Sequence, residues 1–281
     1  MSARVVLHIG TMKSGTSFIQ SVLGANQREL AAQGCVFLGG RFGAQSRAVR
    51  DIYRLPAQPR RNRRRWARLA AQARELDAGA ALVSMEFLSF AGDAAVAEFL
   101  EPLEGLDVRV VLTVRDQFRA IPAQWQTYTR NFGTDAWPAY LRAIQAPRLR
   151  GTRPSRAYST FHRAQDVVPM LQRWGHAAGV SGLDVVTVPG PGAPRDELWR
   201  RFAAVAGVPQ GVVDLERSRD NPSLGFASCD YLRRLNTHLA DVAPRRYRRR
   251  SARWPRRCSS ACARRKAVPS WTRARRRTPA S

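Results

Sequence analysis

The feature that most constrains the fold is a run near the start of the chain, in which an apolar segment, a glycine loop and an amphipathic segment follow one another directly. Residues 5–7 are Val-Val-Leu, residues 8–17 read His-Ile-Gly-Thr-Met-Lys-Ser-Gly-Thr-Ser, and residues 18–23 return to apolar positions at helical spacing. This order predicts a buried strand, a tight loop and a helix N-terminus. Such a loop directs backbone N–H groups and the positive end of the helix dipole toward one point, so it favours a bound phosphate or sulfate.

Lys13 lies inside this loop and is unusual in its context. Among the 47 basic residues, only Lys13 and Lys266 are lysines. A lysine in the loop therefore indicates a need for a compact charge with three donors, which a planar guanidinium does not supply. A glycine turn with a chance lysine is the structural alternative. The loop is not a Walker A motif, because that pattern ends in Gly-Lys-Ser/Thr, whereas Lys13 precedes the segment Ser-Gly-Thr-Ser.

The order Lys13-Ser14-Gly15-Thr16-Ser17 resembles the 5′-phosphosulfate loop of the sulfotransferases that use 3′-phosphoadenosine 5′-phosphosulfate (PAPS). In that family the hydroxyls and amides of the loop hold the 5′-phosphate, and its lysine stabilises the bridging oxygen as sulfate leaves. The resemblance implies that Ser14, Gly15, Thr16 and Ser17 bind the donor. It implies that Lys13 both binds the donor and acts catalytically.

A second segment resembles the 3′-phosphate motif of the same family, which consists of a strand, an arginine, a helix and a serine eight residues after the arginine. Residues 107–114 read as a strand, Arg115 follows, and residues 117–126 have helical spacing, but Ala123 stands where the serine is expected. Loss of that hydroxyl would weaken 3′-phosphate binding by about 1–2 kcal/mol, unless an amide or water replaces it. An Arg115 that only caps the strand or pairs with Asp116 is the structural alternative.

Glu86 is the candidate general base. It follows a predicted buried strand at residues 80–84, and ligands gather at the carboxyl ends of strands in open α/β sheets. A carboxylate there could take the proton from an acceptor hydroxyl, and the resemblance implies a glutamate or histidine base in this region. A half-buried glutamate that pairs with an arginine is the structural alternative.

The whole pattern predicts one α/β domain over residues 1–244, with a parallel β-sheet flanked by helices; the resemblance implies a P-loop NTPase-like sulfotransferase fold. Further strands are expected near residues 35–38 and 183–188. Residues 41–60 and 147–160 read as loops, the second on the acceptor side. Helices are expected at 15–33, 60–76, 134–146, 161–177, 194–206 and 226–240.

The net charge of +26 is unevenly distributed. The segment 245–281 holds fourteen arginines, one lysine and no acidic residue, which predicts a tail that is disordered on its own. The tail is interpreted as an arm for nucleic acid or an anionic membrane surface, as a passive tail, or as an aberrant, out-of-frame terminus. The remaining positive charge suits an anionic cofactor and does not require nucleic acid.

The resemblance implies sulfuryl transfer from PAPS, without a metal, to a hydroxyl or amine of a carbohydrate, lipid or small-molecule acceptor. The alternatives are a nucleic-acid-binding protein, a P-loop phosphotransferase and a catalytically inactive sulfotransferase homologue. No stretch is long enough to span a membrane, and no signal peptide is evident, so a cytoplasmic location is expected. The four cysteines lack zinc-site spacing and are expected as free thiols. The oligomeric state stays open.

Overall fold

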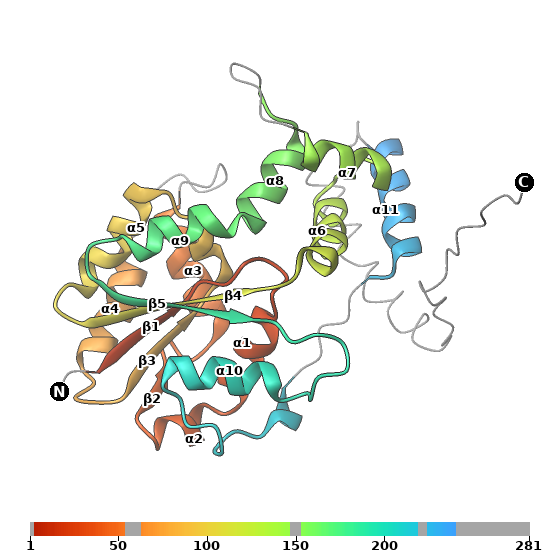
Figure 1. Ribbon diagram of the computed structural model, residues 1–281. Coiled ribbons are helices and arrows are strands. Elements are labelled where there is room, and N and C mark those ends of the chain that lie inside the picture. Colours follow the sequence, from red (N-terminus) through yellow and green to blue (C-terminus); the bar gives the residue numbers. More distant parts are fainter. Residues whose placement is uncertain (1–2, 54–62, 147–152, 219–223, 240–281) are drawn as a thin grey trace, which may run out of the picture.

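The computed structural model describes residues 3–53, 63–146, 153–218 and 224–239. Its centre is a five-stranded, all-parallel sheet in the order β2–β3–β1–β4–β5 (Figure 1). The strands are β1 (Arg4–His8), β2 (Cys35–Phe37), β3 (Ala80–Ser84), β4 (Asp107–Val114) and β5 (Val180–Thr187). The predicted α/β class with a parallel sheet is confirmed. The glycine loop follows the central strand, β1, so it lies in the middle of the carboxyl edge.

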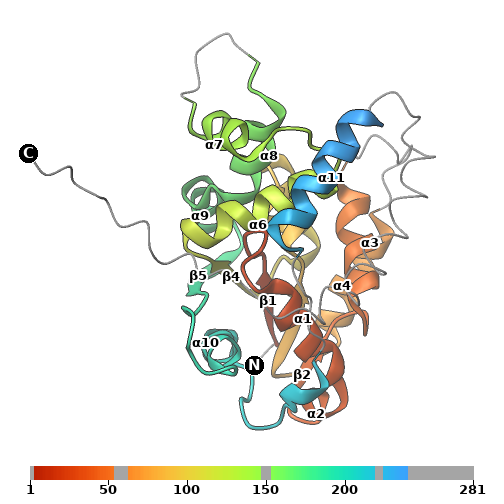
Figure 2. The same cartoon turned by 90° about the vertical axis from the view of Figure 1, so that its right-hand side faces the viewer.

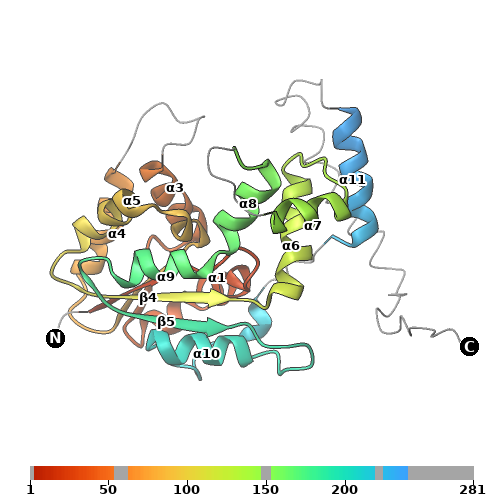
Figure 3. The same cartoon turned by 45° about the horizontal axis from the view of Figure 1, so that its top comes forward.

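Helices cover both faces of the sheet because side chains alternate along its strands. On β1, Val5 and Leu7 join the core beneath α3, α4, α5 and α9, whereas Val6 joins the core over α1, α2 and α10. In Figure 3 the helices α3, α4, α5 and α9 lie on one side of β4 and β5, and α10 lies on the other. Their bounds are α1 (Thr16–Ala25), α2 (Gln27–Ala31), α3 (Phe42–Ile52), α4 (Arg64–Arg74), α5 (Asp93–Leu100), α9 (Val167–Gly175) and α10 (Glu197–Ala206).

A separate helical group lies beyond the carboxyl ends of β4 and β5 (Figure 2). It consists of α6 (Gln117–Arg130), α7 (Trp137–Gln145), α8 (Arg156–Gln165) and α11 (Phe226–His238). Its own core contains Trp125, Tyr128, Tyr140, Phe161 and Cys229. Short 3-10 turns complete the described elements: η1 (Glu86–Phe90), η2 (Glu101–Leu103) and η3 (Leu215–Arg217). This group encloses the carboxyl edge from one side.

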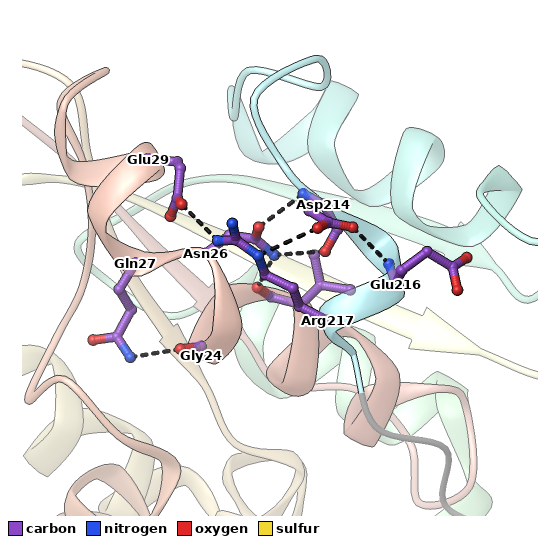
Figure 4. A network of polar contacts seen from close by, with 8 residues as sticks. Gly24, Asn26, Gln27, Glu29, Asp214, Glu216 and Arg217 are labelled. Atoms are coloured by element: carbon purple, nitrogen blue, oxygen red, sulfur yellow. Dashed lines mark hydrogen bonds and ion pairs between the residues drawn. The ribbon is translucent and has the colours of Figure 1, made fainter.

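The helix predicted over residues 15–33 is wrong in one respect, because the chain breaks at Asn26 into α1 and α2. The Asn26 side chain is fully buried and donates to the carbonyls of Val22 and Asp214 at 2.9 and 3.1 Å. Its oxygen accepts the Asp214 N–H at 2.8 Å. Arg217 adds a contact of 2.6 Å to Glu29 (Figure 4). The break therefore serves to dock the segment around η3 onto the α1–α2 corner.

The predicted loop at residues 41–60 is also wrong, since residues 42–52 form α3; residues 54–62 lie outside the described part. The buried positions of this helix include Gln45, Ala48, Val49 and Ile52, which have helical spacing. The apolar helical pattern is hard to recognise in the sequence because polar Gln45 occupies one of the buried positions. Its amide donates to the carbonyls of Leu38 and Leu82 and accepts the Ser84 N–H, so it is buried without an unmet hydrogen bond.

The predicted loop 147–160 and helix 161–177 have wrong boundaries. The helix α8 begins at Arg156, where the Ser155 hydroxyl accepts the Tyr158 N–H, and ends at Gln165; α9 then begins at Val167. Pro169 explains the break, because its ring cannot follow the Gln165 carbonyl in a continuous helix. Residues 147–152 lie outside the described part of the chain, as does the predicted tail 245–281. No helix among the described residues has the length and apolar character needed to cross a membrane.

Candidate anion-binding site

The glycine loop joins β1 to α1 and has a backbone that two glycines make possible. Gly15 has φ 81°, and a Cβ there would lie 2.4 Å from Leu198 Cδ2. Gly10 has φ 33°, and a Cβ there would lie 2.5 Å from Thr16 Cγ2. Lys13 itself adopts φ 67°, a conformation that is uncommon for a residue with a side chain. The loop is thus a constrained turn whose backbone is packed against its surroundings.

The N–H groups of residues 13–17 have no protein acceptor among the described residues. The preceding part of the loop, by contrast, is anchored. The N–H groups of Ile9 and Thr11 donate to the carbonyls of Val111 and Thr113 on β4, at 2.9 and 2.8 Å, and the Met12 N–H donates to Ala164 on α8 at 3.3 Å. Five consecutive open donors at a helix N-terminus are the arrangement that binds an anion.

A buried chain of hydroxyls and one imidazole fixes this loop to the three central strands. Ser84 on β3 contacts His8 Nδ1 at 2.7 Å, and His8 Nε2 contacts the Thr113 hydroxyl on β4 at 3.0 Å. Thr113 in turn contacts the Ser14 hydroxyl at 2.7 Å, and Ser14 donates to the Thr11 carbonyl at 2.6 Å. Burial lowers the pKa of His8 to about 3, so the imidazole is neutral.

The Thr11 carbonyl determines the direction of every hydrogen bond in this series of side chains. Because Ser14 must donate to the Thr11 carbonyl, Thr113 donates to Ser14 and uses its oxygen to accept from His8 Nε2–H. The neutral His8 then accepts at Nδ1 from the Ser84 hydroxyl. This assignment follows from hydrogen-bond chemistry. Each group in the chain has a partner, so the loop is held in one arrangement.

Lys13 is surrounded by charges of both signs. Burial lowers the pKa of its ammonium, and the positive charges of Arg130 and Arg115 lower it further, whereas Glu86 acts in the opposite direction. Clustered cations repel one another, and an anion between them removes the repulsion. The electrostatics of the loop therefore favour a negatively charged ligand.

Arg115 follows β4 and lies beside the loop. Its guanidinium donates to the Lys13 carbonyl at 3.4 Å, and its Nε is buried without a partner in the described structure. Burial lowers the pKa of Arg115, with a smaller contribution from Arg119. Asp116 does not hold Arg115; it caps α6 by accepting the Arg119 N–H at 3.0 Å and it also pairs with the Arg119 side chain. Arg115 is consequently available for an anion.

Glu86 lies at the carboxyl end of β3, and β3 pairs with β1, so Glu86 and the glycine loop follow neighbouring strands. The carboxylate is half-buried and accepts the Gln20 amide at 2.9 Å; Gln20 also donates to the Ser84 carbonyl at 3.1 Å. No ion pair between Glu86 and an arginine occurs in the described residues. Lys13 is one positive neighbour of the carboxylate.

The structure brings Lys13, Gly15, Arg115 and Glu86 to one edge of the sheet, but the loop hydroxyls differ in placement. The Ser14 hydroxyl is fully buried and bonds Thr113. Ser14 therefore contributes only its backbone N–H to the five open donors. Thr16 is buried and Ser17 is exposed on the first turn of α1. The serine expected at position 123 is an alanine that is 8% exposed on α6.

Several residues of the site escaped sequence reasoning. His8 and Thr113 lie at strand ends and carry no motif, although a histidine directly before a glycine loop is a signal that could have been weighed. Arg130 and Cys229 reach the neighbourhood of Lys13 from α6 and α11. Burial raises the pKa of the Cys229 thiol to about 11, so it is neutral despite the nearby cations. Both described cysteines, Cys35 and Cys229, are free thiols.

Comparison with family models, curated proteins and solved structures yields no match for this chain. Within the described residues, no three His, Cys, Asp or Glu side chains are grouped so that they could hold a metal ion.

Proposed function

We propose that this protein is a PAPS-dependent sulfotransferase. The observation that carries the proposal is the combination of Lys13 and five open N–H groups in one glycine loop, with Arg115 beside it on the neighbouring strand. A donor with a phosphate at each of two positions needs two separate cationic anchors. The loop and the unpaired Nε of Arg115 supply them.

The residues fit this donor in the following way. The amides of residues 13–17 would hold the 5′-phosphate, and Arg115 would hold the 3′-phosphate. Lys13 neutralises charge on the departing phosphate, which makes it both a binding and a catalytic residue. Ser14 contributes its amide, because its hydroxyl is committed to the Thr11 carbonyl. Bound PAPS supplies the sulfuryl group, whose bond to the bridging oxygen breaks as the bond from the acceptor oxygen to sulfur forms.

Glu86 is the proposed base that takes the acceptor's proton. Gln20 orients the carboxylate through a hydrogen bond of 2.9 Å. Exchanging the carboxylate for an amide keeps the shape and removes the proton acceptor. Glu86→Gln is therefore expected to slow PAPS turnover about 100-fold or more while donor-product binding stays within about threefold of wild type. Equal turnover in the variant and the wild type would remove Glu86 from the mechanism.

A catalytically inactive homologue that binds the donor is the second candidate, and Ala123 is the observation that favours it. The position lacks a hydroxyl that could donate a hydrogen bond to the 3′-phosphate. Such a protein would bind the donor product and fail to turn over PAPS with any acceptor. Comparing binding with turnover separates the two candidates.

The decisive experiment is a calorimetric titration with 3′-phosphoadenosine 5′-phosphate, the product left after transfer. Lys13→Ala and Arg115→Ala are each expected to bind it at least tenfold more weakly, because each loses a charge-assisted contact of about 1.5–3 kcal/mol. Arg28→Ala is the matched control, since Arg28 is exposed on α2 at the other end of α1. No binding by the wild type, or equal loss in the control, would refute the proposal.

A further inference from the structure

A second group of cations lies next to Glu86, on the side of η1 that packs against α3 and α8. The Arg50 guanidinium sits over the Phe87 ring at 5.0 Å from its centroid, and that of Arg163 sits over the Phe90 ring at 5.1 Å. The two rings contact each other, with centroids 5.8 Å apart. Arg50, Arg163, Arg173, Phe87 and Phe90 are called the arginine–aromatic cluster below.

Stacking determines what these guanidinium groups can still bind. A guanidinium that lies over an aromatic ring uses its flat face, and its N–H donors remain in the plane and point outward. Arg50 and Arg163 are exposed, and in the described structure neither donates a hydrogen bond nor forms an ion pair. The rings also restrict both side chains before a ligand arrives. Two preorganised donor sets are therefore available to an oxyanion.

Arg173 adds a third charge from α9. Its Nε is buried and has no partner in the described residues. Arg173 and Arg163 are both near the Tyr53 hydroxyl, where they oppose the rise in its pKa that burial causes. That hydroxyl donates to the Phe87 carbonyl at 2.8 Å. Tyr53 thereby connects Arg173 to the aromatic pair, and the three arginines belong to one neighbourhood.

The acidic residues around the cluster are engaged elsewhere. Asp51 pairs with Arg65 at 2.6 Å, and Asp166 pairs with His162 at 2.9 Å. Glu86 accepts from Gln20. None of the three arginines forms an ion pair with these carboxylates in the described part of the chain, so their N–H donors remain available to a ligand.

The cluster is also tied to the glycine loop. The residue after Arg163 is Ala164, whose carbonyl accepts the Met12 N–H at 3.3 Å. The side-chain amide of the next residue, Gln165, donates to the Met12 carbonyl at 2.7 Å. Glu86 begins the same 3-10 turn that ends with Phe90. When an acceptor places its hydroxyl at Glu86, the rest of the acceptor therefore lies beside the arginines of the cluster.

We propose that the acceptor is itself an anion, a hydroxyl compound whose carboxylate or sulfate binds Arg50 and Arg163. This inference rests on the proposed function, because it assigns a substrate class to the same site. A carboxylated phenol and an acidic sugar share this chemistry, and matched neutral compounds distinguish the contribution of the charge in each. 

The test measures calorimetric binding to the full chain saturated with 3′-phosphoadenosine 5′-phosphate. The probes are 4-hydroxybenzoate against its methyl ester, and methyl β-D-glucuronide against methyl β-D-glucoside. At least one acid is expected to bind about tenfold or more tightly than its neutral counterpart, and the acid that binds identifies the phenol or the sugar as the preferred frame.

Arg50→Ala and Arg163→Ala are expected to abolish the preference for the acid, while Arg28→Ala retains it. Both variants should bind the donor product as the wild type does, because neither residue contacts the glycine loop. Equal binding of acid and neutral compound, or no binding of either acid, overturns the inference. Absence of donor-product binding in the wild type would instead count against the proposed function. In that case the acids, titrated alone, test the cluster by the same comparison.

Discussion

Replacing Thr113 by valine tests the buried chain that holds the glycine loop. Valine keeps the shape of threonine and removes the hydroxyl that accepts from His8 Nε2 at 3.0 Å and donates to Ser14 at 2.7 Å. His8 is 1% exposed and Ser14 is fully buried, so water cannot replace the lost contacts. An unsatisfied buried donor costs about 1–3 kcal/mol, and the Ser14 oxygen adds about 1 kcal/mol because it still donates to Thr11. The expected loss is about 2–4 kcal/mol.

The assay is urea unfolding followed by circular dichroism, which gives the free energy of unfolding for each variant. Thr113→Ser retains both hydrogen bonds and should lose only about 1 kcal/mol for one methyl group. Thr187→Val is the matched strand control, because the Thr187 hydroxyl is exposed where it accepts from Arg201 at 2.9 Å. It should change stability by less than about 0.5 kcal/mol. A loss below about 1 kcal/mol in Thr113→Val, or an equal loss in the control, would refute the role of these buried hydrogen bonds in holding the loop.

The remaining predictions concern the loop and the α1–α2 corner. Gly15→Ala introduces a Cβ at positive φ against Leu198 and should reduce the unfolding free energy by about 1–3 kcal/mol and weaken donor-product binding; a variant as stable as wild type would contradict the geometry. Lys13 has a lowered pKa, so it loses its proton, and the site loses affinity for donor product, at a lower pH than an ordinary lysine would. Titrations from about pH 6 to 10 should show this fall in the wild type and not in Lys13→Arg, which stays charged; parallel curves would exclude Lys13 as its source. Asn26→Ala removes three buried hydrogen bonds and should cost about 2–4 kcal/mol in urea unfolding, against less than about 1 kcal/mol for Gln27→Ala, and similar losses would contradict the docking role of Asn26.

The local sequence pattern predicted the elements that are marked by apolar runs or by glycine. The strands at residues 80–84 and 107–114 have the predicted bounds, because continuous apolar runs mark strands that are buried on both faces. The order strand, glycine loop and helix was equally legible, since glycine at positive φ and a helix start leave a direct signature in the sequence. These features fixed the fold class and the position of the candidate loop.

The helices that prediction missed depend on partners far away in the chain. Gln45 is buried in α3 only because the backbone of β2 and β3 satisfies its amide, and no local pattern announces that. Asn26 ends α1 because the backbone of Asp214, far along the chain, bonds its side chain. A polar residue that is buried by a tertiary hydrogen bond looks, in the sequence, like a surface residue.

The site divides in the same way. By itself, the sequence determined Lys13, its glycine loop and Arg115 as the residues to consider, because their order along the chain carries a phosphate-binding pattern. Only the tertiary structure decided that the Ser14 hydroxyl turns inward to Thr113, that Glu86 lies beside the loop, and that arginines from α3, α8 and α9 gather next to it. The physical reason is that hydrogen bonds and charges act across space, so side chains from distant segments acquire their roles when strand order brings them to one edge of the sheet.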